Sequence, residues 1–433
     1  MTAAATLATA RPFTVAGRVA GVVGAEIEIR GLRLRVGDAL TIRSAAGDLP
    51  AEVVALDAHG ARALLFGAAE GIGRGDLVFR KREGLDVMVS DALMGRVLDG
   101  LGRPLDGKAA PDGERISLRD ERPHPLRRLR IDAPLPVGVR AIDGLCTVGR
   151  GQRVGLFGGS GVGKSTLLGM MARGTEADVN VLALVGERGR EVREFVEDDL
   201  GPDGLERTVV VVATSDQPAL MRTRAAFLAT RIAEWFADRG KDVLLMMDSL
   251  TRLAMAQREV GLAAGEPVTA RGYTPSVFSM LAEVLEQAGP RSRGTVTGFY
   301  TVLVEGDDMN DPIADASRSI LDGHVVLDRR LAIAGRYPAI DPLSSVSRLA
   351  DRITSDEDRN QARSIQAAIA AAEEVRDLVE VGAYVSGTNP AADRGLAAMP
   401  RITEFLSQGA RDVSAFSESW GQLRELASHV EAV

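Results

Sequence analysis

Residues 158–166, GGSGVGKST, constrain this chain more than any other stretch of its sequence. They follow a short apolar run at 154–157 and precede a segment, 167–173, with the pattern of a helix. A strand, a glycine-rich loop and a helix in this order are the context of a phosphate-binding loop. The glycines allow a tight turn in which successive backbone N–H groups point at phosphate oxygens, and the positive end of the helix faces the same oxygens. We therefore predict a nucleoside triphosphate site rather than a chance glycine-rich turn.

The residue types within this loop predict separate roles. Lys164 is expected to reach the β- and γ-phosphates, and the hydroxyl of Ser165 to take one coordination position of Mg²⁺. The rest of the loop is expected to surround the phosphates, largely through backbone N–H groups. These further nucleotide-binding residues are Gly159, Ser160, Gly161, Val162, Gly163 and Thr166.

Composition bounds the class of protein. A chain of 433 residues is too long for one compact core, so two or three domains are expected. The net charge of −8 argues against a surface built mainly for nucleic acid or an anionic membrane. The single cysteine, Cys146, excludes an internal disulfide framework, and no apolar run is long enough to span a membrane. With no Lys or Arg in residues 1–10 to suggest a secretory signal, a cytoplasmic enzyme is expected.

The pattern along the chain predicts three domains. Residues 1–84 carry short alternating apolar runs between Gly and Asp turns, which predict a six-stranded β-barrel. An oligonucleotide-binding barrel would expose aromatic side chains, whereas Phe13, Phe66 and Phe79 suit a core, so a structural barrel is favoured. Residues 85–348, after an irregular lead-in to about 150, alternate apolar strands with helices, which predicts an α/β domain with a mostly parallel sheet. Residues 349–433 predict a helical domain.

Asp248 directly follows an apolar strand predicted over 243–247. At the carboxyl end of a parallel strand a carboxylate faces the ligand crevice, so we expect Asp248 to join Ser165 at the metal, through a water molecule. The alternative is that Asp248 or Ser249 caps the next helix. The phosphate loop in the same chain favours the metal site.

Glu187 follows another apolar strand, predicted over 179–185, and its glycine. A carboxylate at this edge could orient and polarise the water that attacks the γ-phosphate. The alternative is a surface acid paired with Arg188, Arg190 or Arg193. The pattern alone does not choose between the two.

Four stretches, GGSGVGKST, LVGERGREV, LLMMDSLTR and PAIDPLSSVSR, together resemble the catalytic-subunit family of rotary-type ATPases, and the agreement runs from about residue 17 to the C-terminus. Within that family, segments such as GRVLDGLGRPLDG and ATSDQPAL are most similar to the flagellum-specific ATPase of type III protein export. The virulence-secretion ATPases share most of them. The resemblance implies a RecA-like P-loop domain, with ATP and Mg²⁺ as ligands.

The resemblance also implies roles for single residues of this chain. Glu187 matches the catalytic glutamate, and Arg188 a residue that contacts the γ-phosphate region. Asp248 matches the Walker B aspartate, and Arg252 an arginine near the subunit boundary.

Two further matches lie near the end of the ATPase domain. Tyr337 matches an aromatic residue that packs on the adenine ring, although the pattern alone equally allows a core tyrosine at the turn before Pro338. Arg348 matches the arginine finger, although the pattern alone favours a surface arginine. An arginine supplied in trans stabilises the charge of the transition state, and Arg348 shares this chain with Glu187, which implies a homohexamer of equivalent sites.

The resemblance further implies partners: the stalk and regulator proteins of an export apparatus, chaperone–substrate complexes, and peripheral association with the inner membrane through such partners. Residues 306–312 and 266–275 are predicted partner-contact loops that line a pore or face a stalk. Residues 1–10 are shorter and less apolar than the regulator-docking helix of the family, so the sequence leaves open whether they dock a regulator in that way.

Three alternatives remain beside an export ATPase. An RNA-translocating hexamer is disfavoured by the acidic composition and the few aromatic residues of the barrel, so no nucleic-acid partner is expected. A synthase catalytic subunit would take its finger from another subunit, and a non-catalytic scaffold would not need Lys164, Glu187 and Asp248 together.

Overall fold

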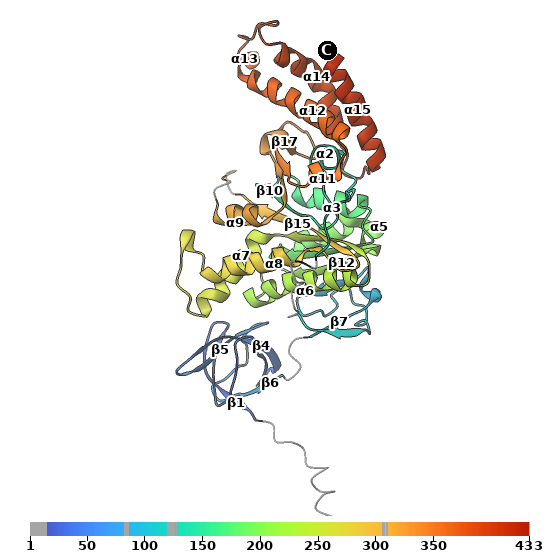
Figure 1. Cartoon of the computed structure of the whole chain (residues 1–433). Coiled ribbons are helices and arrows are strands. Elements are labelled where there is room, and N and C mark those ends of the chain that lie inside the picture. The colour runs from blue at the N-terminus through green and yellow to red at the C-terminus, as the bar shows by residue number, and fades with distance from the viewer. Residues whose placement is uncertain are drawn as a thin grey trace, which may run out of the picture.

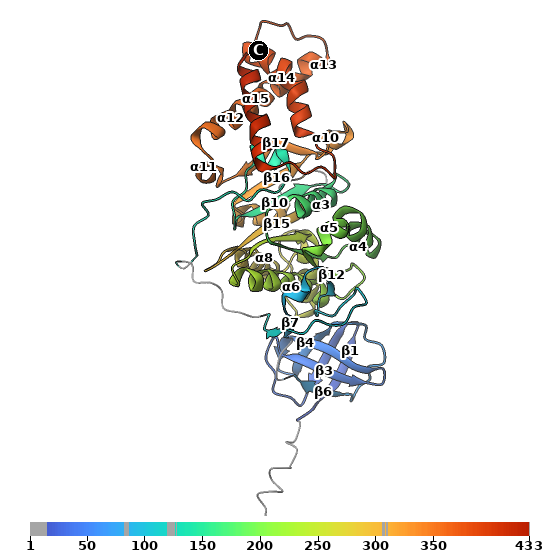
Figure 2. The ribbon, with the colours of Figure 1, turned by 90° about the vertical axis from the view of Figure 1, so that its right-hand side faces the viewer.

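The computed structural model describes residues 15–81, 86–118, 126, 128–304, 308 and 311–432, and its three parts are stacked along one long axis (Figures 1 and 2). The first is a closed antiparallel barrel with the strand order β1-β2-β5-β4-β3-β6. Closure removes the exposed strand edges that would otherwise pair with other chains. The strands are β1 (Gly17–Val23), β2 (Glu26–Arg30), β3 (Ala39–Ser44), β4 (Gly47–Asp57), β5 (Gly60–Leu65) and β6 (Leu77–Arg80).

The alternation seen in the barrel sequence corresponds to its two faces. In β2, Ile27 and Ile29 are buried while Glu26 and Glu28 lie outside. The side chain of Arg62 on β5 donates to the backbone oxygens of Ala263 and Ala264, at 3.0 and 3.1 Å, and so ties the barrel to the central domain. The predicted six-stranded barrel is confirmed; Phe13 lies outside the described residues.

The central sheet has the strand order β17-β16-β10-β15-β13-β11-β12-β8, with β14 beside β15. All neighbouring pairs are parallel except β16–β17 and β14–β15. The strands are β8 (Val97–Asp99), β10 (Arg153–Gly158), β11 (Val179–Val185), β12 (Thr208–Ala213), β13 (Asp242–Asp248), β14 (Gly289–Pro290), β15 (Thr295–Leu303), β16 (Gly323–Leu327) and β17 (Ile340–Ser347). The predicted mostly parallel sheet is confirmed.

The lead-in before residue 150 is more regular than the sequence pattern indicates. Its strand β8 pairs with β12 in the central sheet, and β7 (Val87–Val89) pairs with β9 (Glu114–Ile116) in a separate ribbon. Arg128, within this lead-in, donates to the backbone oxygens of Ala288, at 2.8 Å, and Glu286.

Helices cover both faces of the sheet and form the C-terminal part. One apolar core packs α6, α7 and α8 against the sheet, and the other joins α3 and α2 to α12, α14 and α15, so the C-terminal helices continue the core of the central domain. Among the helices described, none is long and apolar enough to cross a membrane. The helices are η1 (Asp91–Leu93), α2 (Arg140–Leu145), α3 (Lys164–Gly174), α4 (Gly189–Glu194), η3 (Phe195–Leu200), α5 (Gly201–Glu206), α6 (Ala219–Asp238), α7 (Leu250–Ala263), η4 (Ala270–Gly272), α8 (Pro275–Gln287), α9 (Pro312–Ile320), α10 (Arg329–Ile333), α11 (Ala350–Ile353), α12 (Asp356–Glu374), α13 (Arg376–Glu380), α14 (Pro390–Leu406) and α15 (Phe416–Ala432).

The predicted C-terminal helical domain is confirmed. The domain limits 1–84, 85–348 and 349–433 stay a prediction.

Candidate nucleotide site

The loop between β10 and α3 has the conformation that a phosphate cradle needs. Gly161 and Gly163 have φ angles of 79° and 92°, a left-handed conformation that favours glycine. The ammonium group of Lys164, at the start of α3, is buried and donates to the backbone oxygens of Gly158, at 2.8 Å, and Gly159. Burial lowers the pKa of Lys164 to about 8. Phosphate oxygens would supply the negative charge that this buried cation favours.

The surface of the loop is open to a ligand. Ser160, Gly161 and Ser165 are exposed, whereas Gly159 and Val162 are buried beneath them. The loop therefore presents its turn and the Ser165 hydroxyl to solvent, where a triphosphate could enter.

Two carboxylates lie at the same edge of the sheet as this loop. Asp248 ends β13 and is buried, and its Oδ1 accepts a hydrogen bond of 2.6 Å from the hydroxyl of Thr301 on the neighbouring strand β15. Burial raises the pKa of Asp248, and the bond from Thr301 opposes that shift. The helix that follows is capped by Ser249, whose hydroxyl accepts from the N–H of Arg252 at 3.3 Å. Asp248 is thus not the cap and remains at the site.

Glu187 follows the adjacent strand β11, whose Leu184 pairs with Asp248. Its Oε1 lies 3.0 Å from Nε of Arg252, and Nη1 of that arginine donates to the backbone oxygen of Gly186 at 2.5 Å. Burial, with the charge of Asp248 next in importance, raises the pKa of Glu187. The carboxylate is paired, but with Arg252 rather than with the arginines that follow it in sequence.

Thr301 was not predicted as part of the site from the sequence. It lies inside a buried strand that also carries Thr295, Thr297 and Tyr300, so its hydroxyl does not stand out in the sequence. Its partner, Asp248, is distant in sequence, so only strand order reveals the pair.

Two more of the predicted residues, Tyr337 and Arg188, are exposed. Tyr337 is 48% exposed, which does not fit a core tyrosine, and its ring faces Gly163: a Cβ added to that glycine would lie 3.7 Å from the ring. Arg188 is exposed and lies at the start of α4, 3.6 Å from the carboxylate of Glu191.

Arg348 lies away from these residues. It is exposed and follows β17, whose last residue, Ser347, pairs with Gly323, and Gly323 pairs with Val154 near the start of β10. The phosphate loop begins at the other end of β10, after Gly158, and at about 3.3 Å per residue Val154 and Gly158 are about 13 Å apart along the strand. Arg348 therefore lies at the edge of the sheet where the parallel strands begin, whereas the phosphate loop of its own chain lies at the opposite edge, where they end.

The two loops predicted as partner contacts lie close together. Arg271, in the loop at 266–275, lies 3.2 Å from Asp308 and 3.8 Å from Asp311 of the second loop. Most of the second loop, residues 306, 307, 309 and 310, lies outside the described residues.

The donor set at the site fits magnesium with a triphosphate. Ser165 and Asp248 provide hard oxygen ligands, as Mg²⁺ prefers. Among the described residues no group of three or more His, Cys, Asp or Glu side chains could hold a metal ion. A magnesium ion with one or two protein ligands, its other positions taken by phosphate and water, matches this sparse set.

A glycine-rich cradle with a buried lysine and two carboxylates from neighbouring strands, all at the carboxyl edge of a parallel sheet, defines a P-loop protein that binds nucleoside triphosphates. Residues 138–347 match the nucleotide-binding domain of the ATP synthase alpha/beta family, and residues 354–425 match the T3SS EscN ATPase C-terminal domain.

Two curated relatives cover nearly the whole chain. The flagellum-specific ATP synthase of Bacillus subtilis (strain 168) is 49% identical over 96% of this chain and 96% of its own length. The type 3 secretion system ATPase of Xanthomonas euvesicatoria is 48% identical over 96% of this chain and 94% of its own length.

A solved relative has the same fold. The assembled ATPase EscN of the enteropathogenic E. coli type III secretion system matches with a TM-score of 0.90 at 45% identity, over 95% of this chain and all of EscN. In its complex with the central stalk EscO, EscN matches with a TM-score of 0.88 at 44% identity, again over 95% of this chain and all of that chain. The chain belongs to the ATP synthase alpha/beta family, in the group of flagellum-specific and type 3 secretion system ATPases.

Proposed function

We propose that this protein hydrolyses ATP with Mg²⁺ as a ring of identical protomers, a hexamer, and that hydrolysis energises flagellar type III protein export. The observation that carries the proposal is that the candidate site residues lie at two opposite edges of the sheet. Lys164, Glu187 and Asp248 meet at the carboxyl edge, whereas Arg348 is exposed at the other. A protomer thus holds a cradle at one edge and an exposed guanidinium at the other.

Each residue at the cradle has a role that its geometry supports. Lys164, released from the loop carbonyls, neutralises the β- and γ-phosphates. Glu187 is the proposed base that orients the attacking water and accepts its proton, with Arg252 holding the carboxylate in place. Bound magnesium would neutralise charge on the phosphates, with Ser165 and Asp248 as its protein contacts.

Arg348 is the proposed finger for the site of a neighbouring protomer, and Tyr337 the residue that packs on the base. Arg188, beside Glu187, is the proposed contact to the γ-phosphate region. These assignments follow the family resemblance and agree with the exposure of all three side chains.

The proposed partners of this chain are further protomers, a central stalk and components of an export apparatus. EscN has been solved in an assembled state and with its stalk EscO, which supports a ring and a stalk partner for this chain. The ion pairs of Arg271 with Asp308 and Asp311 join the two loops that we propose to face that stalk. Export regulators and chaperone–substrate complexes are the further proposed partners, in the cytoplasm at the inner membrane export apparatus.

Arg348→Ala tests the shared site. It should bind nucleotide with unchanged affinity and lose roughly 10³-fold or more in kcat, because a finger in trans contributes that order of magnitude. Full activity in this variant, measured by phosphate release under assembling conditions, would refute the proposal. The matched control is Arg318→Ala: Arg318 is a nearby surface arginine of α9, and its backbone oxygen, which accepts from Arg348 at 3.2 Å, remains in the variant.

Virulence export is the second candidate, because the Xanthomonas euvesicatoria relative is named a type 3 secretion system ATPase and EscN belongs to the type III secretion system of an enteropathogenic E. coli. A strain that lacks this chain decides between them. Loss of swimming and of flagellin secretion supports the flagellar role, whereas normal swimming refutes it.

A further inference from the structure

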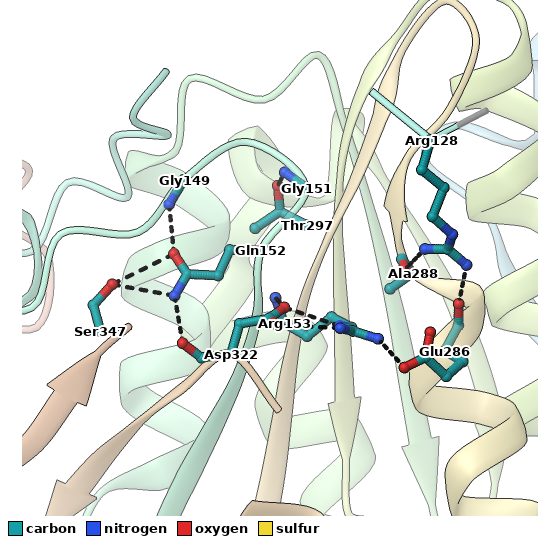
Figure 3. Close-up of polar contacts among 10 residues, drawn as sticks. All are labelled: Arg128, Gly149, Gly151, Gln152, Arg153, Glu286, Ala288, Thr297, Asp322 and Ser347. Atoms are coloured by element: carbon teal, nitrogen blue, oxygen red, sulfur yellow. Dashed lines mark hydrogen bonds and ion pairs between the residues drawn. The ribbon is translucent and has the colours of Figure 1, made fainter. Parts of the chain in front are cut away.

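A buried polar network surrounds the start of β10, at the end of the strand remote from the phosphate loop (Figure 3). The side chain of Gln152 is fully buried at its centre. Its Oε1 accepts from the N–H of Gly149 at 2.8 Å, and its Nε2 donates to the backbone oxygen of Asp322 and to the hydroxyl of Ser347, both at 3.1 Å. One amide thus joins the turn before β10 to the residue that precedes β16 and to the last residue of β17.

Asp322 is the second centre of the network. Its carboxylate accepts from the backbone N–H, Nε and Nη2 of Arg153, at 3.1, 2.9 and 3.1 Å. The other end of that guanidinium lies 2.7 Å from the carboxylate of Glu286 on α8. Bidentate, charge-assisted pairs of this kind fix geometry as well as adding stability. The side chains of Arg153 and Asp322 are only 16% and 24% exposed, so solvent screens the pair weakly.

The backbone of Asp322 holds Arg348. Its carbonyl oxygen accepts from the N–H of Arg348 at 3.0 Å as well as from Gln152. The Arg348 side chain, in contrast, is exposed and donates to the backbone oxygen of Arg318 at 3.2 Å. The base of the side chain is therefore fixed while its guanidinium reaches outward.

We propose that Asp322 and Gln152 are positioning residues for Arg348: they hold the end of β17 against the start of β10, so that the guanidinium is presented to the neighbouring protomer. The proposal rests on the trans role of Arg348 proposed above. The strand that receives this network at one end carries the protomer's own phosphate loop at the other. One rigid strand thus joins the cradle of a protomer to the cation that it offers to its neighbour.

Asp322→Asn tests the proposal, because it keeps the shape of the side chain and removes its charge. A displacement of about 1 Å at a catalytic group can cost about 100-fold in rate. We expect kcat to fall about 10- to 100-fold, with KM for ATP changed less than about twofold, since the nucleotide contacts lie at the other edge of the sheet. Ser347→Ala, a milder change in the same network, should lower kcat in the same direction by a smaller factor.

Asp106→Asn is the matched control. Asp106 accepts a bidentate pair from Arg96, at 2.6 and 3.1 Å, and a backbone N–H bond from Val97 at 3.3 Å, so the same kind of bonds is lost. This pair lies beside β8, at the far end of the strand order from β17. Asp106→Asn should lower the melting temperature about as much as Asp322→Asn does and leave kcat within about twofold of that of the unchanged protein.

Mixed rings separate positioning from general damage. Excess Glu187→Gln protomers contribute little turnover of their own but carry an intact Arg348 network, so they offer a correctly placed finger to the remaining sites. When Glu187→Gln protomers are mixed with Arg348→Ala protomers, ATPase activity per Arg348→Ala site should rise several-fold. When they are mixed with Asp322→Asn protomers, ATPase activity per Asp322→Asn site should also rise several-fold.

The outcomes are distinguishable. A rise with Arg348→Ala but none with Asp322→Asn overturns the positioning role and leaves the shared site intact. No rise with either variant overturns the trans finger, and the positioning role with it. An Asp322→Asn protein whose loss is in KM rather than kcat, or that matches Asp106→Asn in kcat, also overturns the proposal.

Discussion

Replacing Tyr337 by alanine should weaken binding of the nucleotide base and leave binding of phosphates unchanged. The ring lies beside Gly163 in the phosphate loop, within contact distance of the position of an added Cβ at 3.7 Å, and 48% of the residue is exposed. Stacking of a base on an aromatic side chain contributes about 1–3 kcal/mol. At about 1.4 kcal/mol per tenfold, Tyr337→Ala should therefore raise Kd for ATP about 5- to 150-fold.

The fold should be little affected by this change. The ring is half-exposed, so its truncation should lower the free energy of unfolding by about 1 kcal/mol. The backbone oxygen of Tyr337 accepts from the N–H of Gln408 at 2.8 Å, and this bond remains in every variant. Tyr337→Phe keeps the ring and should bind ATP within about twofold of the unchanged protein.

Calorimetric titration with ATP and with tripolyphosphate, which has no base, measures the two contributions separately. Tyr337→Ala should lose affinity for ATP only. Equal losses for both ligands would mean that the substitution has disturbed the loop itself, and unchanged ATP affinity would mean that the base binds elsewhere. Either result would refute the assignment of Tyr337 to the base.

Two further predictions concern ionisable groups of the cradle. Because burial lowers the pKa of Lys164 to about 8, the ammonium is charged below that pH and neutral above it, so nucleotide affinity should fall by up to tenfold per pH unit above about 8. Calorimetry between pH 7 and 9.5 measures this decline, and Lys164→Arg, which stays charged, should not show it. The unfolded chain binds the proton of Lys164 more tightly, so the free energy of unfolding without nucleotide should rise with pH from about 8 towards 10.5. Burial and the charge of Asp248 raise the pKa of Glu187, so the ionised carboxylate destabilises the folded state at pH values above the ordinary pKa of a glutamate. Glu187→Gln should therefore increase the free energy of unfolding at pH 8 by on the order of 1 kcal/mol. The same substitution should lower kcat about 10²-fold or more. Denaturant titration without nucleotide checks the stability, and a loss of stability in Glu187→Gln would contradict the prediction.

The parts that the sequence predicts well are those whose signals are local. The strands that lead to Glu187 and Asp248 are largely apolar runs; Asp248 is the last residue of its strand and Glu187 follows two residues after the end of the other, so the pattern alone predicts both at one edge of a parallel sheet. The phosphate loop is recognised by its glycines and its lysine in the same way. The predicted bounds of the three strands β10, β11 and β13 lie within one residue of those in the structure, whereas the helix predicted over 167–173 begins three residues earlier, at Lys164.

The parts that it misses depend on pairing over long distances. Strand β8 is three residues long and lies among turn signals, and only its register with β12, more than a hundred residues later, makes it a strand of the sheet. Thr301 and Asp322 are ordinary polar residues in sequence. Their contacts with Asp248 and Arg348 come from the order of the strands, which hydrophobic periodicity does not encode. The sequence pattern predicts that Arg348 is a surface arginine. Its position at the edge of the sheet opposite the phosphate loop becomes clear only from the register of β17 with β16.

Strand β8 also decides where the molecule can be cut. The match to the nucleotide-binding domain begins at residue 138, yet the outermost strand of the central sheet is formed by residues 97–99, before that boundary. A fragment that starts at 138 would leave β12, whose residues are all buried, as an unpaired edge strand that could pair with strands of other molecules. A fragment of the central domain should therefore begin before Val97 in order to stay in solution. A fragment that begins at residue 138 should precipitate.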